Sequence, residues 1–178
     1  MKYSKKKLLV CLFGFLLFSH KAVAFHPLNP VPHVDLERFM GPWYVIASIP
    51  TFIDRESFNA IESYELDKDG TVSTTFTFRK GSENGPKRTY RPRGFVKPDG
   101  SNALWGMQFI WPIKADYQIV YLDEDYTKVI VAREKRDLVW IMARTPHISE
   151  DEYQDLVRRI VEMGYSKSEL RLTPQVWD

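Results

Sequence analysis

Short runs in which polar and apolar side chains alternate cover most of this chain, and alternation is the pattern of strands that bury one face. In the clearest run, 71–79, the apolar face carries Val72, Phe76 and Phe78 together with Thr74. Clusters of glycine, proline and aspartate separate the runs, as they do in sheets built from hairpins. Strands are predicted over 43–49, 60–66, 71–79, 88–96, 103–111, 117–122, 126–133 and 138–144. Short strands with this punctuation are typical of a sandwich or of an up-and-down barrel.

Prolines define the segments around these strands. Residues 25–33 contain Pro27, Pro30 and Pro32 and are predicted to form an extended or loosely ordered arm. The next residues, 34–40, are predicted to form a short helical turn that plugs the base of the barrel. Pro50 ends the first strand, and Pro92 interrupts the fourth, which indicates an edge or a bulge.

One helix is predicted after the strands. Ser149 and Glu152 form the S-x-x-E pattern of a capping box, in which each residue bonds the backbone of the other. Gly164 ends the helix, because glycine readily adopts the left-handed conformation that follows a last turn. Five apolar side chains recur at helical spacing on one face: Tyr153, Leu156, Val157, Ile160 and Val161. We expect this helix to pack outside a barrel, and 170–172 to add a further strand.

The first 24 residues have the composition of a cleavable signal peptide. A head with four lysines precedes the apolar stretch 8–18, and Ala22-Val23-Ala24 is a small-x-small cleavage site. The apolar stretch is much shorter than the ~20 residues that a membrane-spanning helix needs. We therefore expect Phe25 to start the mature chain and 25–178 to form a single domain. Cys11 lies inside the apolar stretch behind Val10, which does not favour lipid attachment.

Removal of the leader changes the charge and the cysteine content. The full chain has 25 basic and 23 acidic residues, for a formal net charge of +2. The leader holds five of the lysines and no acidic residue, so the predicted mature chain carries −3 and contains no cysteine. This composition excludes disulfide and thiol chemistry and gives no indication of nucleic-acid binding.

Three motifs resemble those of the lipocalin family, and most closely those of the bacterial, outer-membrane lipocalins. Gly41-x-Trp43 is similar to the first family motif, Asp125-Tyr126 to the second and Arg144 to the third. Glu124 stands where the family often has threonine, and the position of Cys11 departs from the lipid-anchored bacterial members. The resemblance covers about 34–174.

The resemblance implies an all-β fold, an eight-stranded up-and-down antiparallel lipocalin barrel with one C-terminal α-helix packed outside. It also implies that Trp43 closes the barrel floor and that Arg144 lies against its ring. A guanidinium over an indole is a favourable cation–π contact, worth roughly 0.5–2 kcal/mol. We therefore interpret Gly41, Trp43, Asp125, Tyr126 and Arg144 as structural residues, not as ligand contacts.

A closed barrel of eight strands is just wide enough to hold one small ligand. Alternation places one large apolar face inside, and burying it against a hydrocarbon chain is favourable by roughly 25 cal/mol per Å². The predicted ligand contacts are Phe76, Phe78, Trp105, Met107, Phe109, Tyr117, Ile119, Tyr121, Trp140 and Met142, and Trp111 and Leu138 are assigned to the same inner face. Trp140 and Tyr117 also match aromatic pocket positions of the bacterial lipocalins. For any single residue, a core role remains the alternative.

Signals of catalysis and of metal binding are missing. The histidines of the predicted mature chain, His26, His33 and His147, lack metal-ligand spacing, and no nucleophile elbow or phosphate loop appears. We predict a binding protein, not an enzyme, with no cofactor and no metal. A basic group at Lys87, Arg88, Arg91, Arg93 and Lys97 is either a solvated outer face or a phosphate contact near the mouth of the barrel.

The function favoured is that of an exported lipocalin that binds a single-chain lipid, a lysophospholipid or a fatty acid, in its cavity. Its expected place is the periplasm or the outer membrane, and its expected role is envelope lipid storage, transport or membrane maintenance. One alternative is a tetrapyrrole carrier with an axial tyrosine such as Tyr117 or Tyr121. Another is an enzyme on a lipocalin-like barrel, for which Glu62 is the candidate if its strand points it inward.

The leader generates the first prediction. Processing after Ala24 removes Cys11, so the exported protein is expected to start at Phe25 and to carry no lipid. Intact mass spectrometry of the protein isolated from the envelope checks this. A mature chain that retains a diacylglyceryl cysteine would contradict it.

Overall fold

The computed structural model describes residues 26–177. The predicted leader with Cys11, and Phe25 as the predicted first residue of the mature chain, lie outside the described residues. Within the described chain, no helix is long and apolar enough to cross a membrane.

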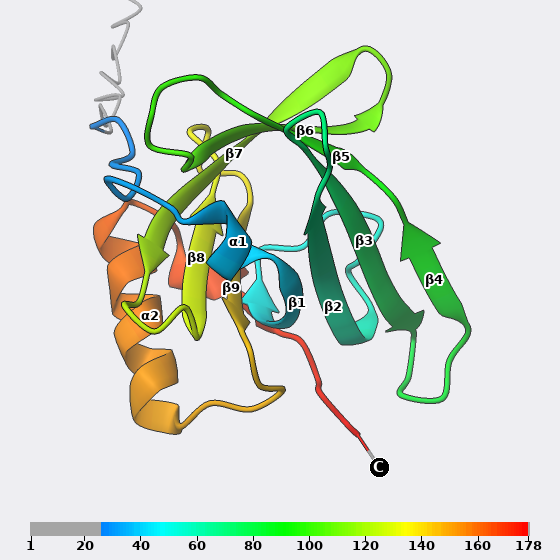
Figure 1. Cartoon of the computed structure of the whole chain (residues 1–178). Helices are drawn as coiled ribbons and strands as arrows, with labels where there is room; N and C mark the ends of the chain where they lie inside the picture. The colour runs from blue at the N-terminus through cyan, green and yellow to red at the C-terminus, as the bar shows by residue number, and fades with distance from the viewer. Residues whose placement is uncertain (1–25, 178) are drawn as a thin grey trace, which may run out of the picture.

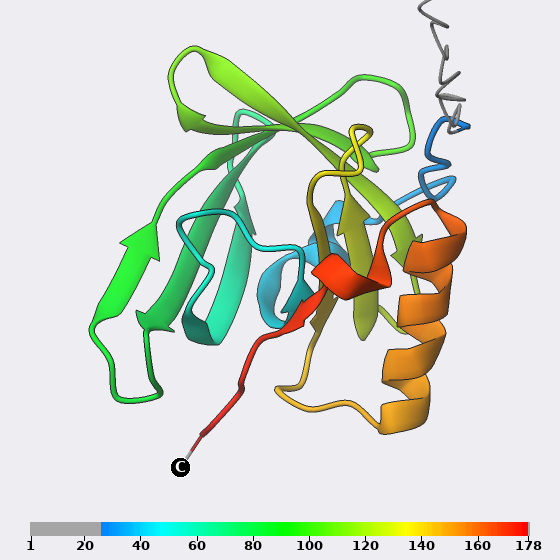
Figure 2. The same cartoon turned by 180° about the vertical axis from the view of Figure 1, so that it is seen from behind.

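The described chain forms one antiparallel sheet that closes on itself (Figures 1 and 2). Its strands are β1 Gly41–Ser48, β2 Ser57–Leu66, β3 Thr71–Lys80, β4 Lys87–Tyr90, β5 Arg93–Val96, β6 Leu104–Ile110, β7 Ile113–Leu122, β8 Lys128–Ala132, β9 Val139–Ala143 and β10 Arg171–Leu172. Strands that follow one another in the chain pair, except that β4 and β5 both pair with β3 and β10 pairs with β1. Pairing of β1 with β9 closes the barrel. Since β4 and β5 form one interrupted side, the barrel has the eight sides that the sequence predicts.

Most predicted boundaries agree with the structure to within a few residues. Pro92 does interrupt the fourth side, because it separates β4 from β5. The predicted strand over 170–172 is β10, which pairs with Ala47 and Ser48 of β1. Four starts differ by two residues or more: β1 begins at Gly41 rather than at 43, β2 at Ser57 rather than at 60, β7 at Ile113 rather than at 117, and β8 at Lys128 rather than at 126. The later start of β8 has a cause, since the Asp123 carboxylate accepts from the backbone N–H groups of Thr127 and Lys128 and holds them in a turn.

The helix α2, Glu150–Glu162, packs on the outside of the barrel (Figure 1). Ser149 and Glu152 form the predicted capping box, and Gly164 has a φ of +94° just beyond the helix. Leu156, Val157 and Ile160 are buried against the outer side of β8 and β9. Val161 is 45% exposed, so its place on the buried face was predicted wrongly.

The N-terminal arm is extended, as predicted, but it is packed rather than loose. Leu28 is buried beside α2, and the N–H of Val31 donates to the carbonyl of Ile119 at 2.9 Å. The arm leads into α1, Leu36–Phe39, which covers one end of the barrel and buries Phe39 inside it. The predicted plug over 34–40 is therefore confirmed, and this end is called the closed end below.

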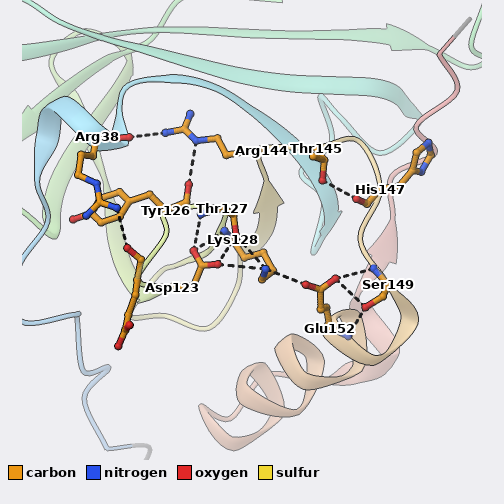
Figure 3. Close-up of polar contacts among 11 residues, drawn as sticks. Arg38, Asp123, Tyr126, Thr127, Lys128, Arg144, Thr145, His147, Ser149 and Glu152 are labelled. Atoms are coloured by element: carbon orange, nitrogen blue, oxygen red, sulfur yellow. Dashed lines mark hydrogen bonds and ion pairs between the residues drawn. The ribbon is translucent and has the colours of Figure 1, made fainter.

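Arg144 ties the closed end together (Figure 3). Its guanidinium lies 3.8 Å from the centre of the Trp43 ring and donates to the carbonyls of Arg38, Phe39, Pro42 and Tyr126. Figure 3 shows the bonds to Arg38 and Tyr126. Gly41 has a φ of +92°, and a Cβ there would lie 3.4 Å from Arg144 Nη1. The first motif therefore needs glycine for its backbone conformation, and a Cβ there would be in van der Waals contact with the guanidinium.

The second motif joins the same cluster. The Tyr126 hydroxyl accepts from the N–H of Asp35 at 2.9 Å, and the Arg38 guanidinium lies 4.0 Å from the Tyr126 ring centre. Asp125 is exposed in the turn, and Asp123 supplies the carboxylate that organises it. Lys128 extends the cluster to α2 by bonding both Asp123 and Glu152, as Figure 3 shows.

Loss of either partner of the Arg144–Trp43 contact is expected to lower stability. Trp43→Ala removes a fully buried aromatic side chain, which typically costs about 3–5 kcal/mol. Arg144→Ala removes the guanidinium donor from the carbonyls of Arg38, Pro42 and Tyr126, while the Phe39 carbonyl keeps the Trp43 indole N–H. The cost is about 1–3 kcal/mol for each carbonyl left buried without another partner. Urea unfolding measures both effects, and Lys68→Ala, an exposed substitution in the β2–β3 turn, is the control. Unchanged unfolding with lost ligand binding would show that these residues do not hold the closed end.

Candidate functional site

A cavity of about 80 Å³ lies inside the barrel, away from α1. Its walls are almost entirely apolar and come from β6, β7 and β9, with Met107, Phe109, Ala115, Leu138 and Trp140. The connections β1–β2, β3–β4, β6–β7 and β8–β9 surround this end, because successive strands run in opposite directions (Figure 2). We call it the open end.

The inward face was predicted well, but only part of it borders the cavity. Of the predicted ligand contacts, Met107, Phe109, Tyr117 and Trp140 line the cavity. The other inward residues do not border it. Trp105, Ile119 and Met142 fill the barrel between the cavity and the closed end, whereas Phe76 and Phe78 lie on β3 beyond Thr74 and pack against Tyr90 of β4. Alternation shows which side chains point inward, but the volume that they leave open depends on how they pack.

Tyr121 was wrongly assigned to the interior. The pairing of β7 with β8 shifts register between Ile119 and Tyr121, which is a β-bulge. A bulge reverses the alternation beyond it. Tyr121 therefore lies outside the barrel, where the Arg159 guanidinium of α2 sits 4.5 Å from its ring centre.

A second irregularity affects the end of β6. Its pairing with β7 shifts register between Met107 and Ile110. Phe109 borders the cavity but is 53% exposed, and Trp111, also assigned to the interior, is 82% exposed in the β6–β7 turn. The inner face of β6 therefore ends at Phe109.

Aromatic rings form the floor beneath the cavity. Trp105 stacks on Tyr117 with ring centres 5.2 Å apart, and Tyr64 meets Trp105 edge-on at 5.8 Å. Phe39 from α1 packs against Trp43 and Tyr64 from below. These contacts leave no open path from the cavity to the closed end, so a ligand must enter at the open end.

A carboxyl group lies at the inner end of the cavity. Glu62 points inward from β2, as the enzyme alternative required, and its accessible surface faces the cavity. The Tyr64 hydroxyl donates to Glu62 Oε2, and the Tyr64 and Tyr117 oxygens are 2.7 Å apart. Since the Tyr64 proton is given to Glu62, Tyr117 is the donor to Tyr64.

Burial raises the pKa of Glu62 from its ordinary value of 4.5 to about 7, and the nearby charge of Asp54 acts in the same direction. The hydrogen bond from Tyr64 opposes this shift, because it stabilises the carboxylate. Burial also raises the pKa of Tyr64 and of Tyr117, so both stay protonated. Near neutral pH the Glu62 side chain, at the inner end of the cavity, therefore changes between its neutral and its anionic form.

Arg133 lies at the other end of the cavity, where β8 leads into the β8–β9 turn. Its Nη1 is 3.3 Å from Asp137 Oδ2, and its Nε is buried and has no hydrogen-bond partner among residues 26–177. Thr51 borders the same rim, with its side chain and N–H bonded to the buried Asp54. The cavity thus has apolar walls, a carboxyl group at the inner end and a cation at the rim.

Larger hollows lie on the outer surface, but they are more open and more polar. One of about 470 Å³ separates the N-terminal arm from the end of α2, and includes Leu28, Arg136 and Met163. Among residues 26–177, no group of three or more His, Cys, Asp and Glu side chains could hold a metal ion. The described histidines, His26, His33 and His147, are all exposed and do not reach the cavity.

Comparison with known proteins agrees with this geometry. Residues 34–175 match the family model for a lipocalin-like domain. This chain belongs to the lipocalin family. Members of that family mostly bind hydrophobic ligands and are mostly not enzymes, so the family supports a hydrophobic-ligand carrier.

Similar proteins come from a plant, a bacterium and an insect. This lipocalin is 32% identical over 163 residues to temperature-induced lipocalin-1 of Arabidopsis thaliana, which covers 83% of each chain. It is 27% identical over 142 residues to the outer membrane lipoprotein Blc of Citrobacter freundii, covering 79% of this chain and 78% of that protein. Insecticyanin from the tobacco hornworm Manduca sexta shares the fold with a TM-score of 0.62 at 17% identity, over 84% and 87% of the two chains.

Glu62 generates a prediction about stability and pH. In the folded protein the pKa of Glu62 is about 7, above its ordinary value of 4.5. The contribution of the protonated Glu62 side chain to the free energy of unfolding is therefore complete below pH 4.5 and is lost as the pH rises through about 7. At 1.36 kcal/mol per unit, the loss is up to about 3 kcal/mol. Glu62→Gln keeps an acceptor for Tyr64 and removes this loss. Urea unfolding should therefore show that the variant is more stable than the parent at pH 8 but not at pH 4.5. Equal differences at both pH values would contradict the assignment.

Proposed function

We propose that this lipocalin carries a single-chain lipid, a lysophospholipid or a fatty acid, in the barrel cavity. The observation that carries the proposal is an enclosed, apolar-walled cavity that is reached only from the open end. A hydrocarbon chain fits such walls, since each CH₂ moved out of water contributes about 0.8 kcal/mol.

The size of the cavity limits how the chain is held. About 80 Å³ is well below the roughly 300–1,000 Å³ of most ligand pockets. The rim side chains Phe109 and Trp140 keep part of their surface exposed, so they can turn aside without opening the packed floor. We therefore expect the chain to enter between them and its remaining length to lie along the rim.

The polar head of the ligand is expected to stay at the rim. The buried Nε of Arg133 lacks a partner there, and an anionic head can supply one as a charge-assisted hydrogen bond. At the inner end, an anionic head would meet the Glu62 carboxyl group, which is unfavourable above pH 7. This arrangement favours a carboxylate or phosphate head at the rim and an acyl chain inside.

The proposed place of action is the cell envelope, in the periplasm or at the outer membrane. Blc proteins of Citrobacter freundii and Escherichia coli are named outer membrane lipoproteins, and this chain begins with the signal-peptide composition described above. A role in storing or transporting envelope lipids follows from that place.

The position of Glu62 favours one second candidate, an enzyme on the same barrel. A carboxyl group with a pKa of about 7 can accept or donate a proton near neutral pH. The two candidates differ in what happens to the ligand, because a carrier returns it unchanged. Mass spectrometry of the lipid before and after incubation distinguishes them. For a tetrapyrrole carrier, an absorption band in the visible range of the purified protein is the corresponding test.

The proposal predicts that affinity rises with chain length. Fatty acids of increasing length should quench tryptophan fluorescence at progressively lower concentrations until the cavity is filled, with short, polar acids binding poorly. Trp140→Ala should weaken binding by roughly 10-fold or more, because it removes a large wall contact.

Tyr121→Ala is the matched control, since it also removes an aromatic side chain, but one that packs on the outside of the barrel. It should bind every acid like the parent protein. Affinity that does not change with chain length, or equal losses in both variants, would rule out chain binding in the cavity.

A further inference from the structure

Large apolar side chains project into solvent at the open end. Ile110, Trp111 and Ile113, around the β6–β7 turn, are 72%, 82% and 69% exposed, and Phe52 in the β1–β2 loop is 87% exposed. Figures 1 and 2 show that the β6–β7 hairpin extends beyond the barrel. None of these four side chains lines the cavity. Their exposure is therefore separate from ligand binding and needs its own explanation, because contiguous exposed apolar groups mark interaction sites.

The same end is basic, whereas the rest of the chain is acidic. The open-end segments 50–56, 79–88, 109–114 and 133–138 contain nine basic and five acidic residues. The remainder of 25–178 contains eleven basic and eighteen acidic residues. The net positive charge is therefore at the same end of the molecule as the projecting apolar side chains.

The β3–β4 hairpin holds basic side chains at a cost to stability. Arg79 and Lys87 are directly opposite each other in the pairing of β3 with β4, and Arg88 and Lys80 flank them. Like charges opposite each other on a hairpin are destabilising. All four side chains are exposed, and none forms an ion pair within residues 26–177. An anionic partner would relieve this repulsion.

We propose that the open end docks on an anionic lipid bilayer, with the β6–β7 tip inserted at the interface and the β3–β4 basic side chains on lipid phosphates. Aromatic and aliphatic side chains flanked by lysine and arginine are the chemistry that a negatively charged membrane surface binds. A protein partner would not require both features on separate hairpins around one mouth. Docking in this orientation sets the cavity entrance against the lipid, so an acyl chain can pass between bilayer and barrel without crossing water. The proposal goes beyond the proposed function and does not depend on the identity of the ligand.

Sedimentation with vesicles tests the docking, using the protein purified from the envelope of the expressing cell. It should bind vesicles of phosphatidylcholine mixed with phosphatidylglycerol and bind pure phosphatidylcholine much more weakly, and added salt should weaken binding. Arg79→Ser/Lys87→Ser should lower the partition by about 30-fold, at about fivefold for each basic side chain near the surface. Ile110→Ser/Trp111→Ser should lower it on the order of 10-fold or more.

Two variants at the closed end are the matched controls. Lys68→Ser/Lys97→Ser removes the same charge from the β2–β3 turn and from the residue after β5, and Leu66→Ser removes an apolar side chain that is 38% exposed. Both should bind vesicles like the parent protein. Fatty-acid titrations of the hairpin variants should be unchanged, which separates docking from ligand carriage.

Three results would overturn the docking. The first is equal losses in the open-end and closed-end variants. The second is equal binding to both kinds of vesicle. The third is a dimer in light scattering that Ile110→Ser/Trp111→Ser abolishes, with no binding of the parent protein to vesicles, since the apolar tip would then serve a second copy of the chain.

Discussion

The Arg144 guanidinium is the contact on which the closed end depends. It lies over Trp43 and donates to carbonyls from α1, from the start of β1 and from the β7–β8 turn. The α1–β1 segment and the β7–β8 turn are far apart in the chain, and the guanidinium holds them together by these hydrogen bonds. Burial lowers the pKa of Arg144, but arginine stays charged at any pH at which the protein is folded. Because the Arg144 contacts fix the closed end, the loops at the open end are available for ligand binding.

Much of the fold follows from local patterns in the sequence. The alternation over 71–79 gives β3 and its inward face, and the capping box at Ser149 and Glu152 gives the start of α2. Errors occur where a bulge reverses the alternation, as at Tyr121. A bulge depends on how two strands pair, and neither strand shows it alone. The late start of β8 depends on the Asp123 carboxylate. The sequence alone does not show which of the three neighbouring acidic residues, Asp123, Glu124 or Asp125, makes this contact.

The candidate site was less predictable than the fold. Of the ten expected ligand contacts, four border the cavity, because side chains such as Trp105 and Met142 fill the barrel below it. Arg133 gave no signal, since a charged residue beside a turn is ordinarily solvated. The sequence supports Glu62 as a site residue only on the condition that its strand points it inward. The period-2 spacing that brings Ala60 and Tyr64 inward places Glu62 inward as well, and that spacing was the available signal.

The two ends of the barrel divide the physical tasks. The closed end holds packed aromatic rings and the hydrogen-bonded Arg144 guanidinium. The open end holds the cavity, the buried Nε of Arg133, which has no hydrogen-bond partner within residues 26–177, and projecting apolar side chains. The central claim is that an acyl chain enters the cavity rather than a surface groove. Nuclear Overhauser effects between a bound fatty acid and protein labelled only at methionine methyl groups test it most directly. Chain protons should contact the Met107 methyl group, on the cavity wall. Contacts confined to the Met163 methyl group, which lines the outer hollow beside α2, would contradict the claim.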